Sequence, residues 1–212
     1  LNRSDPAYDG KLAFYDAEEE VCVGVLVFAE RYRRLEKKMA VQEKDPCRKV
    51  ELTAISRVLA RVPAQPASSF HEALQMVWLM QLIPQIESNG FSISLGRLDQ
   101  YCWPYLKADL AAGTITLEQA QELLDLLWLK FCEILRVDSR DAAEVNAGYY
   151  VAGQNIEVGG VDRGGHDCTN LLSYLCLNAN RHIQLHQPNF TIRLHAGTPQ
   201  EFLDHAVGSI AC

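Results

Sequence analysis

Three polar residues of the types used in catalysis and anion binding occur close together in the segment IESNGFSISLGRLDQYCWPY, which spans residues 86–105. Asp99 could act as a catalytic acid beside Arg97, whose guanidinium could bind an anion. Alternatively, these two side chains, together with Gln100, could lock a loop through charge-assisted hydrogen bonds. We favour the lock, because buried polar groups in proteins commonly serve structure.

Two serines precede this cluster at alternating positions. Residues 91–95 read Phe-Ser-Ile-Ser-Leu, which predicts a short strand with Ser92 and Ser94 on one face and the apolar residues on the other. If the apolar face packs against helices, both hydroxyls point into an interior. A hydroxyl there needs a hydrogen-bond partner, and a bound polar substrate would supply one.

Three histidines have a spacing that superficially resembles a metal site. His182 and His186 lie four residues apart, and His195 follows. Pro188 comes almost directly after His186, however, and a helix does not comfortably carry both histidines to that point. We therefore expect no metal ion at these residues.

Four glycines invite comparison with a phosphate-binding loop. Gly159-Gly160 is followed by Gly164-Gly165. The stretch lacks both the GKS/T ending and the GxGxxG spacing of such loops. The glycines therefore predict a tight turn.

The elements that must position these residues follow from the hydrophobic pattern. Apolar residues recur at intervals of three and four, which predicts amphipathic helices. Capping-box spacings at Ser69 and Thr198 mark two helix starts, and Asp167 is expected to cap another. The expected helices cover residues 14–41, 48–61, 69–82, 116–136 and 167–180, with a last one from about residue 199.

Two further extended segments lie between these helices. Residues 149–161 end at two glycines, and residues 189–195 alternate like a strand. Strands separated by helices suggest a parallel sheet or a barrel wall with helices outside. The sequence therefore predicts an α/β fold that is rich in helix.

Charge and cysteine content limit the classes of function. The net charge of −7 argues against a basic surface for nucleic acid or an anionic membrane. The seven cysteines are odd in number and widely spaced, which favours free thiols in a reducing cytoplasm. No apolar run reaches the length of a membrane span. The chain begins at Leu1 and ends in a helical pattern, so we expect a fragment of a longer protein.

Four motifs in one order resemble the glycyl radical enzymes, and the likeness extends over nearly the whole chain. This superfamily contains pyruvate formate-lyase. The likeness is nearest to its dehydratase and lyase branches, such as glycerol dehydratase, choline trimethylamine-lyase and hydroxyproline dehydratase. The motifs are SSFHEALQMVWLMQLIPQIESNGFSISLGRLDQYCWPY, ITLEQAQELLDLLWLK, GQNIEVGGVDRGGHDCTNLLSYLCLNA and QPNFTIRLHAGTPQEFL.

The resemblance implies a ten-stranded α/β barrel made of two half-barrels, of which residues 1–212 would form part of one. In such enzymes an activating enzyme that uses S-adenosylmethionine and an iron–sulfur cluster generates a glycyl radical. The radical passes to a cysteine, whose thiyl takes a hydrogen atom from a small substrate. The cysteine loop and the glycine radical domain would lie beyond Cys212, so this chain alone should bind no cofactor and have no turnover.

The resemblance also implies which residues line the pocket. Ser92 matches the serine that hydrogen-bonds a substrate hydroxyl or carboxylate. Phe91 stands where glycerol dehydratase has a histidine, and Gly153 matches a tyrosine of that enzyme. Both departures favour a less polar or ring-bearing substrate and a larger pocket. Arg97, Asp99 and Gln100 would pin the turn beside this site.

The function expected from the resemblance is cleavage of a C–O, C–N or C–C bond in a small polar molecule. Two alternatives remain at this stage: a formate C-acetyltransferase homologue, and a helical interaction module without the chemistry. A full-length homodimer is expected, with the activating enzyme as partner. The isolated piece should be poorly soluble, since half a barrel exposes sheet edges and core.

Overall fold

A computed structural model describes residues 3–89, 92–135, 139–145 and 153–210. The chain divides into two compact units, residues 1–67 and residues 68–212. The first unit is a pair of helices, and the second combines helices with a small sheet. The predicted α/β class is confirmed.

The first unit consists of α1 (Tyr8–Gln42) and α2 (Pro46–Leu59). Pro46 opens α2, because its missing N–H costs nothing at the first helical position, and the Asp45 side chain accepts the Cys47 N–H at 2.9 Å. Leu52 and Ala29 are almost fully buried. Both helices were predicted; the predicted ends agree to within about two residues except at the start of α1, which begins at Tyr8 rather than at residue 14.

The second unit contains seven helices and three strands among its described residues. The helices are α3 (Phe70–Ser88), α4 (Leu98–Tyr101), α5 (Trp103–Ala112), α6 (Leu117–Cys132), α7 (Arg140–Val145), α8 (Leu171–Ile183) and α9 (Gln200–Ile210). The strands are β1 (Gly96–Arg97), β2 (Asn155–Gly159) and β3 (Asn189–Arg193). None of the helices described in either unit combines the length and apolar content needed to cross a bilayer.

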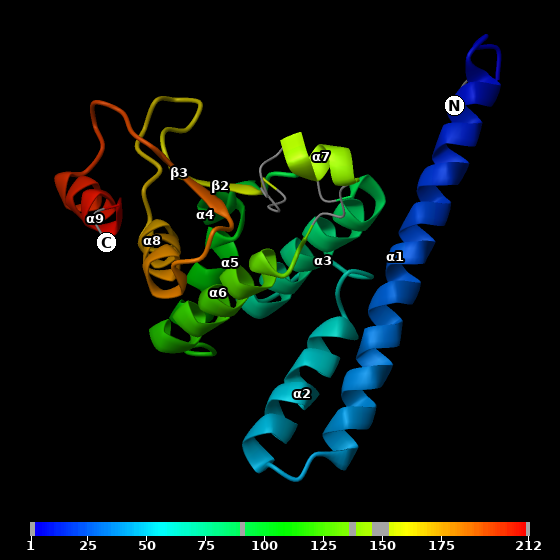
Figure 1. The fold of residues 1–212 in the computed structure, drawn as a ribbon, viewed down its shortest axis with the longest axis horizontal. Helices are drawn as coiled ribbons and strands as arrows, with labels where there is room; N and C mark the ends of the chain where they lie inside the picture. Colours follow the sequence, from blue (N-terminus) through cyan, green and yellow to red (C-terminus); the bar gives the residue numbers. More distant parts are fainter. Residues whose placement is uncertain (1–2, 90–91, 136–138, 146–152, 211–212) are drawn as a thin grey trace. The chain divides into compact units, whose positions relative to one another are not determined.

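The three strands form a parallel sheet in the order β1-β2-β3. Figure 1 shows β2 and β3 side by side in this sheet. The central strand β2 buries Ile156 and Val158 completely. Parallel neighbours need a crossover connection, and α8 supplies it between β2 and β3. The parallel sheet predicted from the alternation of strands and helices is confirmed.

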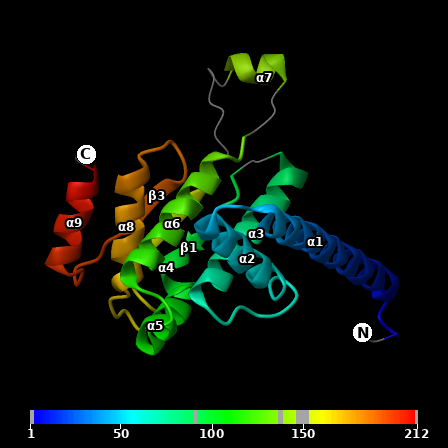
Figure 2. The same cartoon turned by 90° about the horizontal axis from the view of Figure 1, so that it is seen from below.

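The core of the second unit lies where α6 packs against α8 and the sheet (Figure 2). Trp128 and Phe131 of α6 and Leu172 of α8 are buried, and the Trp128 ring also lies 6.2 Å from the ring of Phe190 on β3. These large side chains bury much apolar surface at about 25 cal/mol per Å². The predicted apolar stripe of α6 therefore forms the main packing surface.

In the second unit, side-chain caps define three helix starts. Ser69 accepts the Glu72 N–H at 3.2 Å, while the Glu72 carboxylate accepts from Ser68. Thr116 forms a complete capping box with Gln119. The predicted cap of α8 was wrong: the helix begins after Asn170, whose side chain accepts the Leu172 N–H, and the Asp167 carboxylate binds elsewhere.

The predicted strand at residues 91–95 was also wrong. Residues 92–95 have no regular secondary structure, and β1 consists only of Gly96 and Arg97. Ser92 has φ 53° and Gly96 has φ 68°, both in the left-handed region, and this interrupts an extended strand. Pairing begins only at Leu95, whose N–H donates to the Asn155 carbonyl at 2.9 Å.

Candidate functional site

Ser92 and Gly153 face each other across the start of the sheet. A Cβ built on Gly153 would lie 2.9 Å from the Ser92 Oγ, closer than real Cβ contacts. Gly153 has φ 68°, a conformation that favours glycine. The Ser92 hydroxyl therefore occupies the space that a side chain at position 153 would fill.

Exposure along this segment follows the predicted alternation although the strand is absent. Ser92 and Ser94 are exposed, while Ile93 and Leu95 are half-buried. Phe91, the expected aromatic neighbour, lies outside the described residues. In this chain the Ser92 hydroxyl is on an open face, and no described residue hydrogen-bonds it.

Arg97 and Gln100 bind the end of β2 and the segment that follows it. The Arg97 guanidinium donates to the carbonyls of Gly159 at 2.6 Å and Val161 at 3.0 Å. Gln100 Nε2 donates to the Cys168 carbonyl at 2.9 Å. These partners are backbone carbonyls, so the side chains fasten β1 and α4 to the end of β2.

Asp99 is fully buried at the junction of β2 and α8. Its Oδ2 accepts the Gly159 N–H at 2.8 Å and the Ser173 hydroxyl at 2.6 Å, whereas Oδ1 has no partner among the described residues. Burial raises the pKa of this carboxyl, although the bonds from Gly159 and Ser173 act in the opposite direction. Asp99 therefore joins the carboxyl end of β2 to the first turn of α8.

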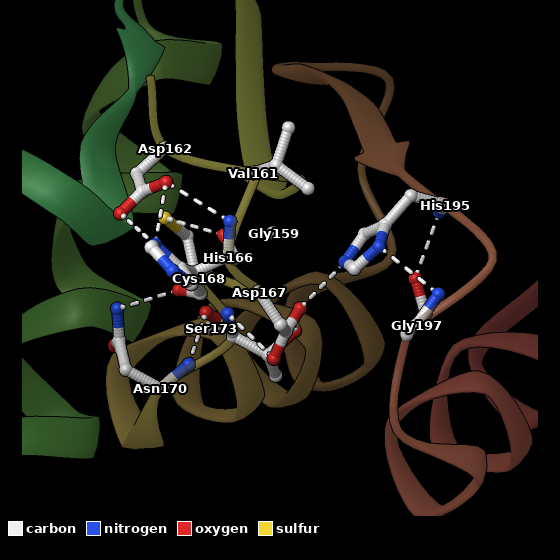
Figure 3. Close-up of polar contacts among 12 residues, drawn as sticks. Gly159, Val161, Asp162, His166, Asp167, Cys168, Asn170, Ser173, His195 and Gly197 are labelled. Atoms are coloured by element: carbon white, nitrogen blue, oxygen red, sulfur yellow. Dashed lines mark hydrogen bonds and ion pairs between the residues drawn. The ribbon is translucent and has the colours of Figure 1, made fainter. Parts of the chain in front are cut away.

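The glycine-rich segment after β2 forms a tight turn, as predicted (Figure 3). The Cys168 N–H donates to the Gly160 carbonyl at 2.9 Å and closes the loop. Within it, Asp162 Oδ1 accepts the backbone N–H groups of Gly164 at 2.7 Å and His166 at 2.9 Å. The bonds from His166 lower the pKa of Asp162. The loop amides thus bind the loop's own carboxylate.

Two of the three histidines considered as metal ligands bind carboxylates, and these carboxylates are different. His182 Nδ1 lies 2.9 Å from Asp125 of α6, and His195 Nε2 lies 2.9 Å from Asp167 (Figure 3). The Gly197 N–H donates to His195 Nδ1 at 3.1 Å, so Nδ1 carries no proton and Nε2–H donates to Asp167. Both ring nitrogens of His195 are therefore used in connecting the segments before α8 and α9.

A network of buried glutamines was not expected from the sequence. Gln81, Gln154 and Gln187 are each at most 3% exposed, and their side-chain amides connect α3, β2 and the residues before β3. The signal in the sequence was Gln81, which falls in the apolar stretch between Leu79 and Ile83. Gln85, one turn further along α3, is also buried, and its amide has no partner among the described residues.

The described cysteines are free thiols. Cys102 and Cys176 are buried, and burial together with the nearby Asp99 raises the pKa of Cys102 to about 12 and that of Cys176 well above its ordinary value. Both are therefore protonated thiols inside the core. Cys212 lies outside the described residues.

Comparison with known proteins places this geometry in a wider context. The family model described as pyruvate formate lyase-like matches residues 1–211. Isethionate sulfite-lyase from Nitratidesulfovibrio vulgaris is 37% identical over 195 residues, which cover 91% of this chain and 23% of that protein.

Two solved structures resemble the chain closely. One comes from work on 1,2-propanediol dehydration in Roseburia inulinivorans, with a TM-score of 0.94 and 40% identity over 99% of this chain and 26% of that one. The other, a glycyl radical enzyme from Archaeoglobus fulgidus, has a TM-score of 0.90 and 35% identity over 97% of this chain and 26% of that one. The chain thus spans about a quarter of the length of these relatives.

Proposed function

Because this chain belongs to the pyruvate formate lyase-like family, we propose that it forms one wall of the substrate pocket in a glycyl radical lyase or dehydratase. The substrate class is a small polar molecule in which a C–O, C–N or C–C bond is broken. This proposal draws on relatives named as a sulfite-lyase, a glycyl radical enzyme and a protein of diol dehydration.

The contact between Ser92 and Gly153 carries the proposal. The Ser92 hydroxyl has no protein partner among the described residues, and the missing side chain at Gly153 makes room for this hydroxyl on the exposed face. In the full-length protein, the remaining three quarters of the chain would enclose this face. A hydroxyl in such a chamber can donate to, or accept from, one polar group of a substrate.

The described cysteines do not fit the hydrogen-abstracting role. Cys102 and Cys176 are buried in the core. Cys22 and Cys47 lie on the helices of the first unit. Cys132 and Cys168 donate their thiol protons to backbone carbonyls. We assign that role to a cysteine outside this chain. A glycyl radical would oxidise this cysteine to its thiyl radical, and an activating enzyme that uses S-adenosylmethionine and an iron–sulfur cluster would generate the glycyl radical. The residues of this chain bind and orient the substrate and exclude water from it.

Phe91 and Gly153 define the substrate class further. In glycerol dehydratase these positions are taken by a histidine and a tyrosine, so the present pair offers a less polar and wider wall. A ring-bearing or longer substrate than glycerol fits these two exchanges. The full-length protein is proposed to be a cytoplasmic homodimer.

Electron paramagnetic resonance on the anaerobically activated full-length protein tests the proposed reaction class. We expect an organic radical doublet, followed by consumption of at least one member of a panel of isethionate, 1,2-propanediol, glycerol, choline and trans-4-hydroxyproline. Absence of the doublet after exposure to an activating enzyme that works on a known relative would contradict the proposal and favour a non-catalytic helical module.

Ser92→Ala in the full-length enzyme is expected to weaken substrate binding or turnover with little loss of fold. A hydrogen bond to a neutral partner contributes about 0.5–1.5 kcal/mol, which corresponds to roughly 2- to 13-fold in kcat/KM, and a charged partner raises the effect. Ser209→Ala is the control, since it removes a hydroxyl that only donates to the His205 carbonyl within α9. Equal kcat/KM for wild type and Ser92→Ala would remove Ser92 from the site.

A further inference from the structure

A network of hydrogen bonds between buried side-chain amides involves the residues next to Ser92 and Gly153. Gln81 Nε2 of α3 donates to the Ile93 carbonyl at 2.7 Å and to Gln154 Oε1 at 2.9 Å. Ile93 is the neighbour of Ser92, and Gln154 is the neighbour of Gly153. One carboxamide therefore connects the two backbone segments that meet at the candidate pocket wall.

Backbone groups determine the orientation of every amide in the network. The Ile93 carbonyl can only accept, so it requires Nε2 of Gln81. Gln154 Nε2 donates to the Phe131 carbonyl at 2.8 Å, which directs Oε1 of Gln154 toward Gln81. Gln187 Oε1 accepts the Gln154 N–H at 2.9 Å, and its Nε2 donates to the His186 carbonyl at 2.9 Å. The positions of the oxygen and nitrogen atoms in all three side-chain amides are therefore fixed by their hydrogen-bond partners.

Burial makes these bonds strong determinants of position. Gln154 is 0% exposed, Gln187 1% and Gln81 3%. Buried amides that lose a partner do not regain it from water, so each bond resists opening. Ser92 itself has no regular secondary structure around it and a left-handed backbone, so its place depends on neighbours that are tied down.

We infer that Gln81 is a positioning residue that, through Ile93 and Gln154, sets the separation of the Ser92 hydroxyl from Gly153. This inference rests on the proposed role of Ser92 and deepens it. Gln81 touches no substrate. Its effect on the reaction passes entirely through the position of the Ser92 hydroxyl.

Hydrogen exchange on the full-length protein, resolved to single amides, tests the structural half of the inference without any substrate. Gln81→Met keeps the volume and removes both donated bonds. We expect about tenfold faster exchange at Leu95, whose N–H donates to the Asn155 carbonyl across this junction, and at Gln154, whose N–H donates to Gln187 Oε1. Exchange at Gly159, at the far end of β2, should be unchanged.

Gln121→Met is the matched control. Gln121 of α6 also donates to one carbonyl and one side-chain oxygen, those of Leu175 at 3.1 Å and Asp125 at 2.8 Å. It should leave exchange at Leu95 and Gln154 as in wild type. If Gln81→Met does not fold, Gln154→Met removes the bond between Gln81 and Gln154 and should also give faster exchange at Leu95. Unchanged exchange at Leu95 in the variant that folds would overturn the inference.

A double-mutant cycle on kcat/KM tests the positioning half, with whichever panel compound the activated wild type consumes. We expect Gln81→Met to lower kcat/KM in the wild-type background and to have no further effect in the Ser92→Ala background. Equal losses in both backgrounds would show a general structural role and overturn the inference. Failure of Ser92→Ala to change kcat/KM would instead contradict the proposed site, while the exchange data would still decide whether Gln81 holds the junction.

Discussion

Gly153→Ala in the full-length protein is expected to lower kcat/KM by about ten- to one hundredfold, more than Ser92→Ala, because the displaced hydroxyl would both lose its bond to the substrate and obstruct the substrate; a displacement of about 1 Å in a positioned group can cost about a hundredfold. The new Cβ would lie 2.9 Å from the Ser92 Oγ, so the hydroxyl must move. The alanine would also hold a backbone φ of 68°, which costs about 1–2 kcal/mol for a residue with a side chain. Steady-state kinetics and thermal unfolding of the same samples separate the two effects.

Gly113→Ala is the matched control for this substitution. Gly113 has φ 66° at the end of α5, and nothing lies within 4 Å of the position that a Cβ would take there. Gly113→Ala should lower the stability by the cost of a left-handed backbone at alanine and leave kcat/KM unchanged. In the Ser92→Ala background the clash disappears, because the next nearest atoms of residue 92 lie 3.7 and 3.8 Å away. Gly153→Ala should then destabilise only as much as Gly113→Ala; an undiminished clash penalty would contradict the geometry.

Asp99→Ala is expected to reduce the free energy of unfolding by about 3–5 kcal/mol, because two buried donors lose their acceptor at about 1–3 kcal/mol each. These donors are the Gly159 N–H and the Ser173 hydroxyl. Asp99→Asn keeps an oxygen that can accept both bonds and removes a buried charge, so its loss should stay within about 1 kcal/mol. Calorimetric unfolding of both full-length variants provides the comparison. Equal destabilisation by Ala and Asn would show that the negative charge itself is required.

The difference in stability between wild type and Asp99→Asn should depend on pH in a defined direction. Burial raises the pKa of Asp99 in the folded protein above its ordinary value of 3.8. At pH values between 3.8 and this raised pKa, the folded protein therefore holds a proton that the unfolded chain has lost. Stability contributed by this group therefore falls as pH rises through that window. The unfolding temperature of Asp99→Asn minus that of wild type should therefore increase from pH 4 upward and become constant above the raised pKa. A difference that shrinks with rising pH would contradict the assignment.

Local signals predicted the helices of this chain better than its strands. Ser69 and Thr116 carry side chains that bind the third helical N–H, and both helices begin where these caps predict. Asp167 offers the same chemistry, but His195, from a distant part of the chain, takes its carboxylate, and Asn170 caps α8. A tertiary contact of this kind leaves no mark in the local pattern.

The region around Ser92 shows the limit of periodicity more clearly. The alternation at residues 92–95 correctly indicates which side chains are exposed, yet the left-handed backbone at Ser92 prevents a strand there. Serine carries no local signal for such a conformation, which glycine or asparagine would. The approach of Gly153 to Ser92 joins positions 61 residues apart and depends on the sheet between them.

The buried glutamines could be found in the sequence only as exceptions to an apolar helix. Gln81 falls among apolar residues of α3, and a polar residue inside such a pattern requires a partner. Which partner it binds follows from the fold, because Ile93 lies in the segment after α3 and Gln154 lies directly before β2, 73 residues from Gln81 in sequence. The resemblance to glycyl radical enzymes pointed to Ser92, whereas the structure identifies what surrounds it.

A structure of the full-length protein with its substrate bound tests the central proposition most directly. We predict that the Ser92 Oγ lies in a closed chamber, about 2.5–3.2 Å from an oxygen or nitrogen of the substrate, with Gly153 on the opposite side of the hydroxyl. A bound substrate that leaves Ser92 facing bulk solvent would contradict the account.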